Sequence, residues 1–528
     1  MRVVRHRYEG FDYDVIIIGS GIGGLVTGSY LARQGVKVLI CEQHIQPGGY
    51  FTSFKRKGYT FDGGIQGCED GGMFFHLFRD LGLFDCIRFK KSNFAIASPD
   101  FFLPIKTVSD VGAFYRKLKN IYPHESSGIE HILGDAEACC NFMSSFQKLP
   151  NPMFTSWRDA LTGLPRWFLE NTSAVKYTGE FFRNMKLTME DYFKLHVSDS
   201  DLYRFLCQMS YSGSPASFGL LFFTFLMDYY HPMGGVQMIP DLFAHYITEH
   251  GGQIKYRTLV EEILVENDKA EGVKTDAGEI FRAPFIISNG DARRTYLKML
   301  PSNVVPESYK QGLRQSTVSE SFFTVFLGVD IPPGELFTHG CSHVLYFPDY
   351  KGVAIDEYQR SDNEDVYARA PIEINVNSIH DPSLAPKGQS TVVIQAAAFA
   401  EFADNWGTKK GKRTKRYKAL KEKVAGQLIA NAQQLIPGLS ERIRYKLTAT
   451  PHTFERYTLN SGGASAGWSF HPQKGFNSGL KSFTGFNPPV KNLFQVGHWS
   501  MTPGGAPSGI ITGTIVSNIV GRRLQWGI

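Results

Sequence analysis

Long apolar segments are missing from this sequence. The longest apolar run, from Phe218 to Met227, has about ten residues, whereas a helix that crosses a bilayer needs about twenty. The run also contains Thr224 and ends at Asp228. The segment before Phe11 lacks the apolar core and the small-residue cleavage site of a secretion signal. We therefore expect a cytoplasmic protein without membrane-spanning segments, and we leave peripheral membrane contact open.

Cysteine is scarce, and the sequence patterns of metal sites are absent. The seven cysteines are odd in number and include no Cys-x-x-Cys pair, so a disulfide framework is not expected and a reducing compartment fits best. They are Cys41, Cys68, Cys86, Cys139, Cys140, Cys207 and Cys341. The 15 histidines show no His-Glu-x-x-His or comparable ligand spacing, so we predict no metal site.

Strong charge of one sign is also lacking, but aromatic residues are abundant. A net charge of +6 over 528 residues is far less than nucleic-acid binders carry, so nucleic acid is not an expected partner. The 41 phenylalanines and 24 tyrosines indicate either an aromatic-rich core or an apolar ligand tunnel. The densest clusters are Phe74-Phe75, Phe181-Phe182 and Phe218 to Tyr230. A chain of this length is expected to form two or more packed units.

A glycine-rich turn follows the first apolar run. Residues 14–19 read as a short buried strand, and Gly19-Ser-Gly21-Ile-Gly-Gly24 then matches Gly-x-Gly-x-x-Gly. Gly19 permits the tight turn, Gly21 lets the backbone approach a pyrophosphate, and Gly24 lets helix and strand pack closely. A helix from about Gly23 to Gln34 would present free N–H groups to the phosphates.

A carboxylate stands where a dinucleotide ribose is expected. Glu42 ends the next strand, Val36 to Glu42, at about the spacing of twenty residues that this motif requires. It would accept hydrogen bonds from ribose hydroxyls and repel the 2′-phosphate of NADP. Strand, glycine turn, helix and carboxylate together predict a dinucleotide site.

Two further glycine-rich segments favour FAD over NAD. Gly48-Gly49 and the run from Gly58 to Gly64 follow Glu42, where backbone must pass close to a flat, extended cofactor. Residues 492–510 read as a strand, a glycine-rich turn and the start of a helix at about Ile510. No second Gly-x-Gly-x-x-Gly is present, which argues against a monooxygenase with its own NADPH domain, and the missing Cys-x-x-Cys argues against a disulfide reductase.

The sequence resembles the phytoene desaturase, carotenoid isomerase and retinol saturase group of FAD-dependent enzymes. Nearly the whole chain takes part, and the resemblance rests on both glycine-rich ends together with, in order, Pro232 to Gly235, Gly251 to Ile263, Ile286 to Asp291, His380 to Pro386 and Asn460 to Gly467. It implies an α/β fold: an FAD-binding Rossmann-like domain of the glutathione reductase and amine oxidase type, with a mixed helical and β-sheet substrate domain. We assign 1–110, 228–300 and 455–528 to the first domain, and 111–227 and 301–454 to the second.

The resemblance also implies roles for single residues. Glu42 would bind the adenosine ribose, Val260 would contact the adenine through its backbone, and the turn at Gly497 would approach the isoalloxazine. Two departures stand out: Tyr50 replaces an arginine, and His498 replaces an acidic residue. The full set of predicted FAD contacts is Gly19, Ser20, Gly21, Ile22, Gly24, Glu42, Gln43, Gly48, Gly49, Val260, Gly497, His498, Pro507, Ser508, Gly509 and Ile510.

The relatives act on carbon–carbon double bonds of long polyenes, which implies a hydrophobic polyene or isoprenoid substrate and desaturation, saturation or isomerisation as the reaction. The candidate acids and bases are Glu69 and Asp70, after the Gly63-Gly64 turn, and His231, before Pro232. The alternatives are an amine-oxidase-like flavoenzyme and a non-catalytic prenyl-binding carrier of the same fold.

Two segments have the composition of membrane-surface contacts. The basic run from Lys409 to Lys418 would attract anionic lipid, although such a run is more often a solvated entry to a helix. The segment from Trp157 to Phe168 mixes aromatic residues with Arg158 and Arg166, as interfacial segments do.

Overall fold

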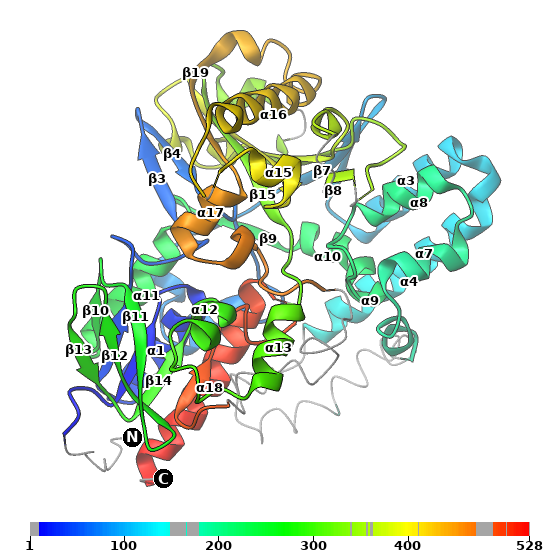
Figure 1. Ribbon diagram of the computed structural model, residues 1–528. Helices are drawn as coiled ribbons and strands as arrows, with labels where there is room; N and C mark the ends of the chain where they lie inside the picture. The colour runs from blue at the N-terminus through cyan, green and yellow to red at the C-terminus, as the bar shows by residue number, and fades with distance from the viewer. Residues whose placement is uncertain are drawn as a thin grey trace.

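The computed structural model describes residues 10–147, 165, 179–337, 340–354, 357–358, 363–409, 411–470, 489–502 and 504–526. Except for Pro165, the segment from Trp157 to Phe168 lies outside these residues. No helix in the described ranges is long and apolar enough to cross a membrane. Figure 1 shows three parts: a sheet with helices near the marked ends, a second sheet under α16, and a group of helices from α3 to α10.

A five-stranded parallel sheet forms the first part. Its order is β10 (Gln253–Lys255), β2 (Val38–Cys41), β1 (Val15–Ile18), β14 (Phe285–Ser288) and β20 (Leu493–Gln495). One face packs against α1 (Ile22–Arg33), α11 (Met238–Glu249) and α18 (Ala506–Trp526). The other face packs against an antiparallel sheet of β11 (Val260–Glu266), β12 (Lys269–Thr275) and β13 (Ile280–Arg282). The carboxyl ends of the parallel strands therefore meet at one edge, where such sheets bind their ligands.

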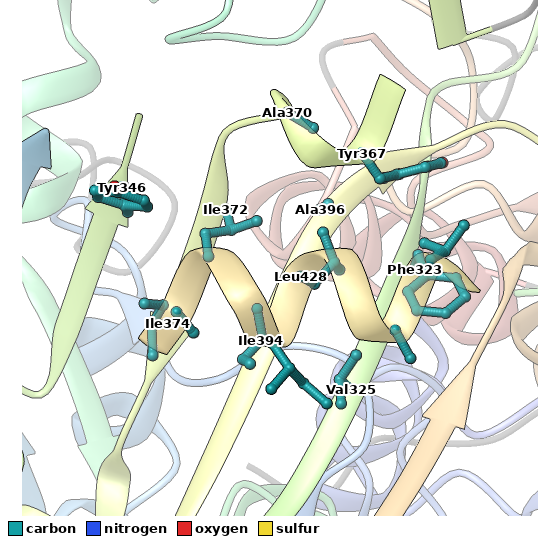
Figure 2. Packing of buried hydrophobic residues seen from close by; sticks show 14 of the residues in the cluster. Phe323, Val325, Tyr346, Tyr367, Ala370, Ile372, Ile374, Ile394, Ala396 and Leu428 are labelled. Atoms are coloured by element: carbon teal, nitrogen blue, oxygen red, sulfur yellow. The ribbon is translucent and has the colours of Figure 1, made fainter. Parts of the chain in front are cut away.

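A seven-stranded mixed sheet forms the second part. Its order is β19 (Ile443–Ala449), β15 (Ser321–Val329), β18 (Ser390–Ala398), β17 (Ile372–Asn375), β16 (His343–Tyr346), β7 (Phe94–Ser98) and β8 (Phe101–Ile105). Figure 2 shows Ile372, Ile374, Ile394 and Val325 from three of these strands packed with Leu428 of α16 (Lys415–Gln433). Because side chains alternate along a strand, the residues between them face away from α16.

The helical part has a core of its own. Its helices are α3 (Val108–Ile121), α4 (Ser126–Phe146), α7 (Met189–His196), α8 (Ser200–Cys207), α9 (Ala216–Leu220) and α10 (Phe222–Met227). Thr107 and Asp110 form a capping box at the start of α3, and Asp199 caps α8. The remaining elements are β3 (Ser53–Arg56), β4 (Tyr59–Asp62), β5 (Cys68–Glu69), α2 (Phe74–Asp80), β6 (Phe89–Lys91), β9 (Tyr229–Pro232), α12 (Ala292–Leu297), α13 (Glu307–Gln315), α15 (Phe402–Trp406) and α17 (Pro451–Thr458).

The structure differs from the sequence-based expectations in three places. Strands β7 and β8 pair into the seven-stranded sheet, although their residues precede the predicted boundary at 110. Helix α11 was not predicted, and α18 begins at Ala506 rather than near Ile510. The earlier start follows from Pro507, because proline fits the first turn of a helix.

Candidate active site

The glycine turn joins β1 to α1. Gly19 has a φ of +91°, which an L side chain rarely adopts, and Gly21 is the N-cap of α1 without any capping side chain. The first backbone N–H groups of α1 therefore have no partner inside the helix and are available to an anion. A Cβ added at Gly24 would lie 2.3 Å from the carbonyl oxygen of Gly19, so the packing that the sequence predicts here is tight.

Ser20 orients the carboxylate of Glu42. Oε2 of Glu42 accepts hydrogen bonds from the backbone N–H (2.8 Å) and the hydroxyl (2.6 Å) of Ser20, and its Oε1 accepts one from the backbone N–H of His44 (2.8 Å). The residue is only 8% exposed. The carboxylate is thus fixed beside the glycine turn rather than free in solvent.

The second glycine pair closes over the first turn. The backbone N–H of Gly48 donates to the carbonyl oxygen of Ser20 at 2.9 Å, and Gly48 forms an isolated parallel bridge with Gly21. Gly49 then follows with a positive φ of +61°. Backbone without side chains therefore lines both sides of this part of the site.

The segment from the end of β20 to the start of α18 contacts the same glycine turn. The backbone N–H of Gly497, just after β20, donates to Oγ1 of Thr512 on α18 at 3.0 Å. A Cβ at Gly23 would lie 2.8 Å from the backbone nitrogen of Gly497, and one at Gly509 would lie 3.2 Å from that of Gly23. Burial lowers the pKa of His498 to about 4, so this histidine is neutral near pH 7.

A cavity of about 1080 Å³ connects the glycine turn with the second sheet and the helical part. Among the predicted cofactor residues, it is lined by Gly19, Gly21, Ile22, Glu42, Gln43, Gly48, Gly49, Val260, Gly497, His498, Pro507 and Ser508. The cavity is not lined by the other four predicted residues: Ser20, Gly24, Gly509 and Ile510. Ser20 instead donates hydrogen bonds to Glu42, and Gly24 packs against the carbonyl oxygen of Gly19.

These residues fit FAD. The uncapped start of α1 suits a pyrophosphate, and the buried carboxylate of Glu42 suits ribose hydroxyls. Cβ atoms added at Gly21, Gly23 and Gly497 would press on the side chain of Asn289, so the backbone is tightly packed here. Asn289 belongs to the site as well, because it lines the cavity and its side chain lies against these glycines. Asn289 lies in the range from Ile286 to Asp291 that contributes to the family resemblance, but the resemblance implied no role for it.

The three candidate acids and bases occupy different environments. Glu69 lines the cavity, and burial raises the pKa of its carboxyl. Asp70 does not line it; its Oδ1 accepts a hydrogen bond from the backbone N–H of Phe75 at 2.7 Å, at the start of α2. His231 is fully buried away from the cavity, with Nε2 2.9 Å from Oδ2 of Asp62.

The three predicted aromatic clusters lie in different parts of the structure. Five residues of the 218–230 cluster line the cavity: Phe218, Phe222, Phe225, Leu226 and Tyr229. Phe74 and Phe75 instead pack with the core of the first sheet, and Phe181 packs with that of the helical part. Carboxyl groups that the sequence did not single out complete the lining: Glu190, Glu320 and Glu373. No group of metal-binding side chains was found within the described ranges.

Known proteins place the chain in one family. The family model described as flavin containing amine oxidoreductase matches residues 22–520. Prolycopene isomerase 2, chloroplastic, of an Oncidium hybrid cultivar is 27% identical over 484 residues, covering 86% of this chain and 75% of the relative. All-trans-retinol 13,14-reductase of Danio rerio is 25% identical over 539 residues, covering 96% and 86%.

Solved structures agree on the fold. A crystal structure of an oxidoreductase from Methanosarcina mazei superposes with a TM-score of 0.59 at 17% identity, covering 96% of this chain and 99% of that one. The predicted α/β fold class and the predicted resemblance are confirmed. The chain therefore belongs to the flavin containing amine oxidoreductase family, and it is an oxidoreductase whose cofactor is FAD.

Proposed function

We propose that this enzyme acts on carbon–carbon double bonds of a hydrophobic polyene or isoprenoid, by desaturation, saturation or cis–trans isomerisation. The observation that carries the proposal is the continuity of the cavity: the FAD residues and a wall of aromatic side chains line the same space. This cavity of about 1080 Å³ extends from the FAD residues to side chains of the second sheet and of the helical part, where a substrate would lie beside the cofactor.

The apolar wall would bind such a ligand through its area. It comprises Phe94, Phe218, Phe222, Phe225, Phe322, Leu345, Phe347, Phe399 and Phe470. Each CH₂ group moved from water into it contributes about 0.8 kcal/mol. The same wall excludes water, which protects the reacting carbons and strengthens every electrostatic contact inside.

The chain and the cofactor would have different roles in the reaction. When bound, FAD accepts or donates a hydride. The chain orients the cofactor through Glu42 and the start of α1, and we assign proton exchange to Glu69, because this carboxyl lines the cavity and burial raises its pKa. We do not extend this role to Asp70 or His231, whose side chains are engaged outside the cavity.

We propose the domain division that the sequence predicts, with one change. Strand β7 pairs with β16, and β8 pairs with β7, so we assign residues 94–105 to the substrate-binding part. The FAD-binding part then holds the five-stranded sheet, and the cavity runs between the two parts.

We also propose peripheral contact with a membrane, because a polyene is stored there. Phe182, Met185 and Leu195 are 57%, 45% and 68% exposed on the helical part. Part of the basic run is already neutralised, since Arg416 pairs with Glu364. The purified protein is expected to pellet with anionic liposomes at low salt; recovery of all protein in the supernatant would contradict this contact.

The reaction is tested by expression in cells that make phytoene, lycopene or retinol, followed by chromatography of the pigments. The expected result is a polyene with one or more double bonds added, removed or isomerised, from a yellow protein that contains FAD. No altered polyene together with peroxide release from amines would overturn the proposal in favour of amine oxidation.

A further inference from the structure

The face of the seven-stranded sheet that points away from α16 forms one wall of the cavity. Alternate residues along three strands and their ends line it, and we call them the sheet wall: Leu345, Phe347, Pro371, Glu373, Gln395, Ala397 and Phe399. Of the described residues in the seven strands, Glu373 is the only ionisable one that lines the cavity. A single carboxyl therefore interrupts a wall that is otherwise apolar or amide.

Glu373 lies in the middle of the sheet wall. The strand register places Leu345 on one side of it and Gln395 on the other. The amide nitrogen of Gln395 is already used, because it donates to the carbonyl oxygen of Gly64 at 3.1 Å and to Oγ1 of Thr324 at 3.2 Å. Glu373 is only partly buried and lines the cavity, so a ligand can reach and cover it.

No nearby cation stabilises the charged form of Glu373 within the described part of the chain. Arg204 and Arg294 are the only lysines or arginines among the described residues that line the cavity. Arg204 forms an ion pair with Asp201 of its own helix, and Arg294 belongs to α12 beside the first sheet. Burial raises the pKa of Glu373 to about 7, and the amide of Asn375 on the same strand lowers it only in part.

The other groups near Glu373 include three that stay uncharged around neutral pH. Burial, and next to it the charge of Glu373, raises the pKa of Tyr229 well above its usual value. Burial also raises the pKa of Tyr211, between α8 and α9, to about 12, and Glu373 is among the charges that contribute. His343 precedes Leu345 by two residues on β16, and burial lowers its pKa well below its usual value. None of these three groups titrates near pH 7.

Two further carboxyls act on the same tyrosines. The charge of Glu69 raises the pKa of both, and that of Glu320 raises the pKa of Tyr211. Burial raises the pKa of each of these carboxyls. Neither belongs to the sheet wall, because Glu69 lies opposite Tyr229 in the pair of β5 and β9, and Glu320 precedes β15. A variant of each must therefore be compared with a variant of Glu373.

We propose that Glu373 is a specificity-determining residue: its neutral carboxyl lets an apolar chain lie against the sheet wall, and its carboxylate excludes that chain. Binding of the apolar substrate is thus coupled to the uptake of a proton by Glu373. The inference rests on the proposed function for the chemical nature of the substrate. A hydrocarbon that covers a carboxylate removes its water and offers no hydrogen bond in return, whereas the neutral acid loses far less.

The titration of one group sets the size of the effect. If only the neutral form binds a hydrocarbon, the competent fraction of the protein falls from about 0.9 at pH 6 to about 0.1 at pH 8, because the pKa of Glu373 is about 7. The dissociation constant of the hydrocarbon is therefore expected to rise about tenfold over this interval and to level off at lower pH.

The test uses the purified FAD-containing enzyme and one neutral probe, the hydrocarbon in which the CH₂OH group of retinol is replaced by CH₃. This probe has no ionisable group, so a change of its affinity with pH belongs to the protein. Dissociation constants come from quenching of protein fluorescence at pH 6, 7 and 8, with the FAD content checked at each pH. The readout therefore does not depend on turnover.

Glu373→Gln keeps a neutral side chain of similar size at every pH. It should bind the probe as the wild type does at pH 6 and about tenfold more tightly than the wild type at pH 8, whereas a merely structural change would alter both constants alike. Glu69→Gln and Glu320→Gln should keep the pH dependence of the wild type. Glu441→Gln, an exposed change outside the cavity, is the matched control and should equal the wild type at each pH.

The outcomes separate the inference from the proposed function. A wild-type affinity that is constant between pH 6 and 8 overturns the inference, and so does failure of the probe to bind at any pH. It is also overturned by a pH dependence that persists in Glu373→Gln, or one that disappears in Glu69→Gln or Glu320→Gln. In each of these cases, altered polyenes in cells that make phytoene, lycopene or retinol would still support the proposed function.

Discussion

Replacing Gly24 by alanine should separate α1 from the turn that precedes it. The added Cβ would lie 2.3 Å from the carbonyl oxygen of Gly19, a backbone atom that cannot rotate away. Helix and turn must move apart by roughly 1 Å to reach van der Waals contact, and such overpacking costs about 1–3 kcal/mol. The same shift lengthens hydrogen bonds from the start of α1 to a phosphate beyond their usual range. FAD affinity should therefore fall by about tenfold to a hundredfold.

The assay measures both effects on the same preparations. The ratio of flavin to protein absorbance gives the FAD content, a titration of apoprotein with FAD gives the dissociation constant, and urea unfolding of the apoprotein gives the stability loss. Gly28→Ala is an intermediate case, because the nearest atoms to its Cβ would be side-chain ends rather than backbone: Cδ1 of Ile40 and of Ile247, at 3.0 and 3.1 Å. It should lose less stability than Gly24→Ala.

Gly426→Ala is the control. Gly426 is exposed in α16 and an added Cβ would meet nothing within 4 Å, so alanine should stabilise the protein by about 0.5–1 kcal/mol and leave FAD binding unchanged. If Gly24→Ala bound FAD as tightly as the wild type and unfolded at the same urea concentration, the packing argument for this turn would be refuted.

Three further predictions concern buried carboxyl groups. Glu42→Ala removes the oxygen that accepts both hydrogen bonds from Ser20 and should lower FAD affinity by about tenfold to a hundredfold, measured by apoprotein titration; wild-type affinity would exclude Glu42 from the site. Burial raises the pKa of Glu373 from 4.5 to about 7, so this group makes folding less favourable as pH rises between these values, by at most about 3 kcal/mol. Glu373→Gln should thus gain thermal stability relative to the wild type as pH rises from 5 to 8, and parallel pH profiles would contradict this. Asp62→Ala leaves Nε2 of His231, the hydroxyl of Ser53 and the backbone N–H of Val236 without their buried partner, which should destabilise the fold by about 3–5 kcal/mol in urea; a loss below about 1 kcal/mol would show that these hydrogen bonds contribute little.

Most of the FAD-binding part can be predicted from local patterns in the sequence. The strand at Val15, the turn at Gly19 and the carboxylate of Glu42 are predictable because their residues are neighbours in the chain and each has a separate physical requirement. Helix α16 also has a local start signal, because the side chain of Thr414 accepts a hydrogen bond from the backbone N–H of Tyr417.

The second sheet and the helical part are harder to predict, because they depend on contacts between residues far apart in the sequence. The alternation Ile372-Glu-Ile-Asn shows that Glu373 faces away from Ile372 and Ile374, but not that this face borders a cavity. Strand β7 pairs in parallel with β16, far along the chain, which is why its membership of the second sheet was missed. Glu190 and Glu320 become neighbours only through Ser212.

The contact between α1 and α18 has a consequence for biosynthesis. Thr27 and Gly513, which meet across these helices, are 486 residues apart in the sequence. At about 5–20 residues per second, a ribosome makes the glycine turn roughly 20–100 s before it makes the helix that closes over it. During that interval the nascent chain has the phosphate-binding turn but neither β20 nor the Gly497 turn. The FAD site is therefore complete only after β20, the Gly497 turn and the start of α18 have been made, so tight FAD binding is a late event.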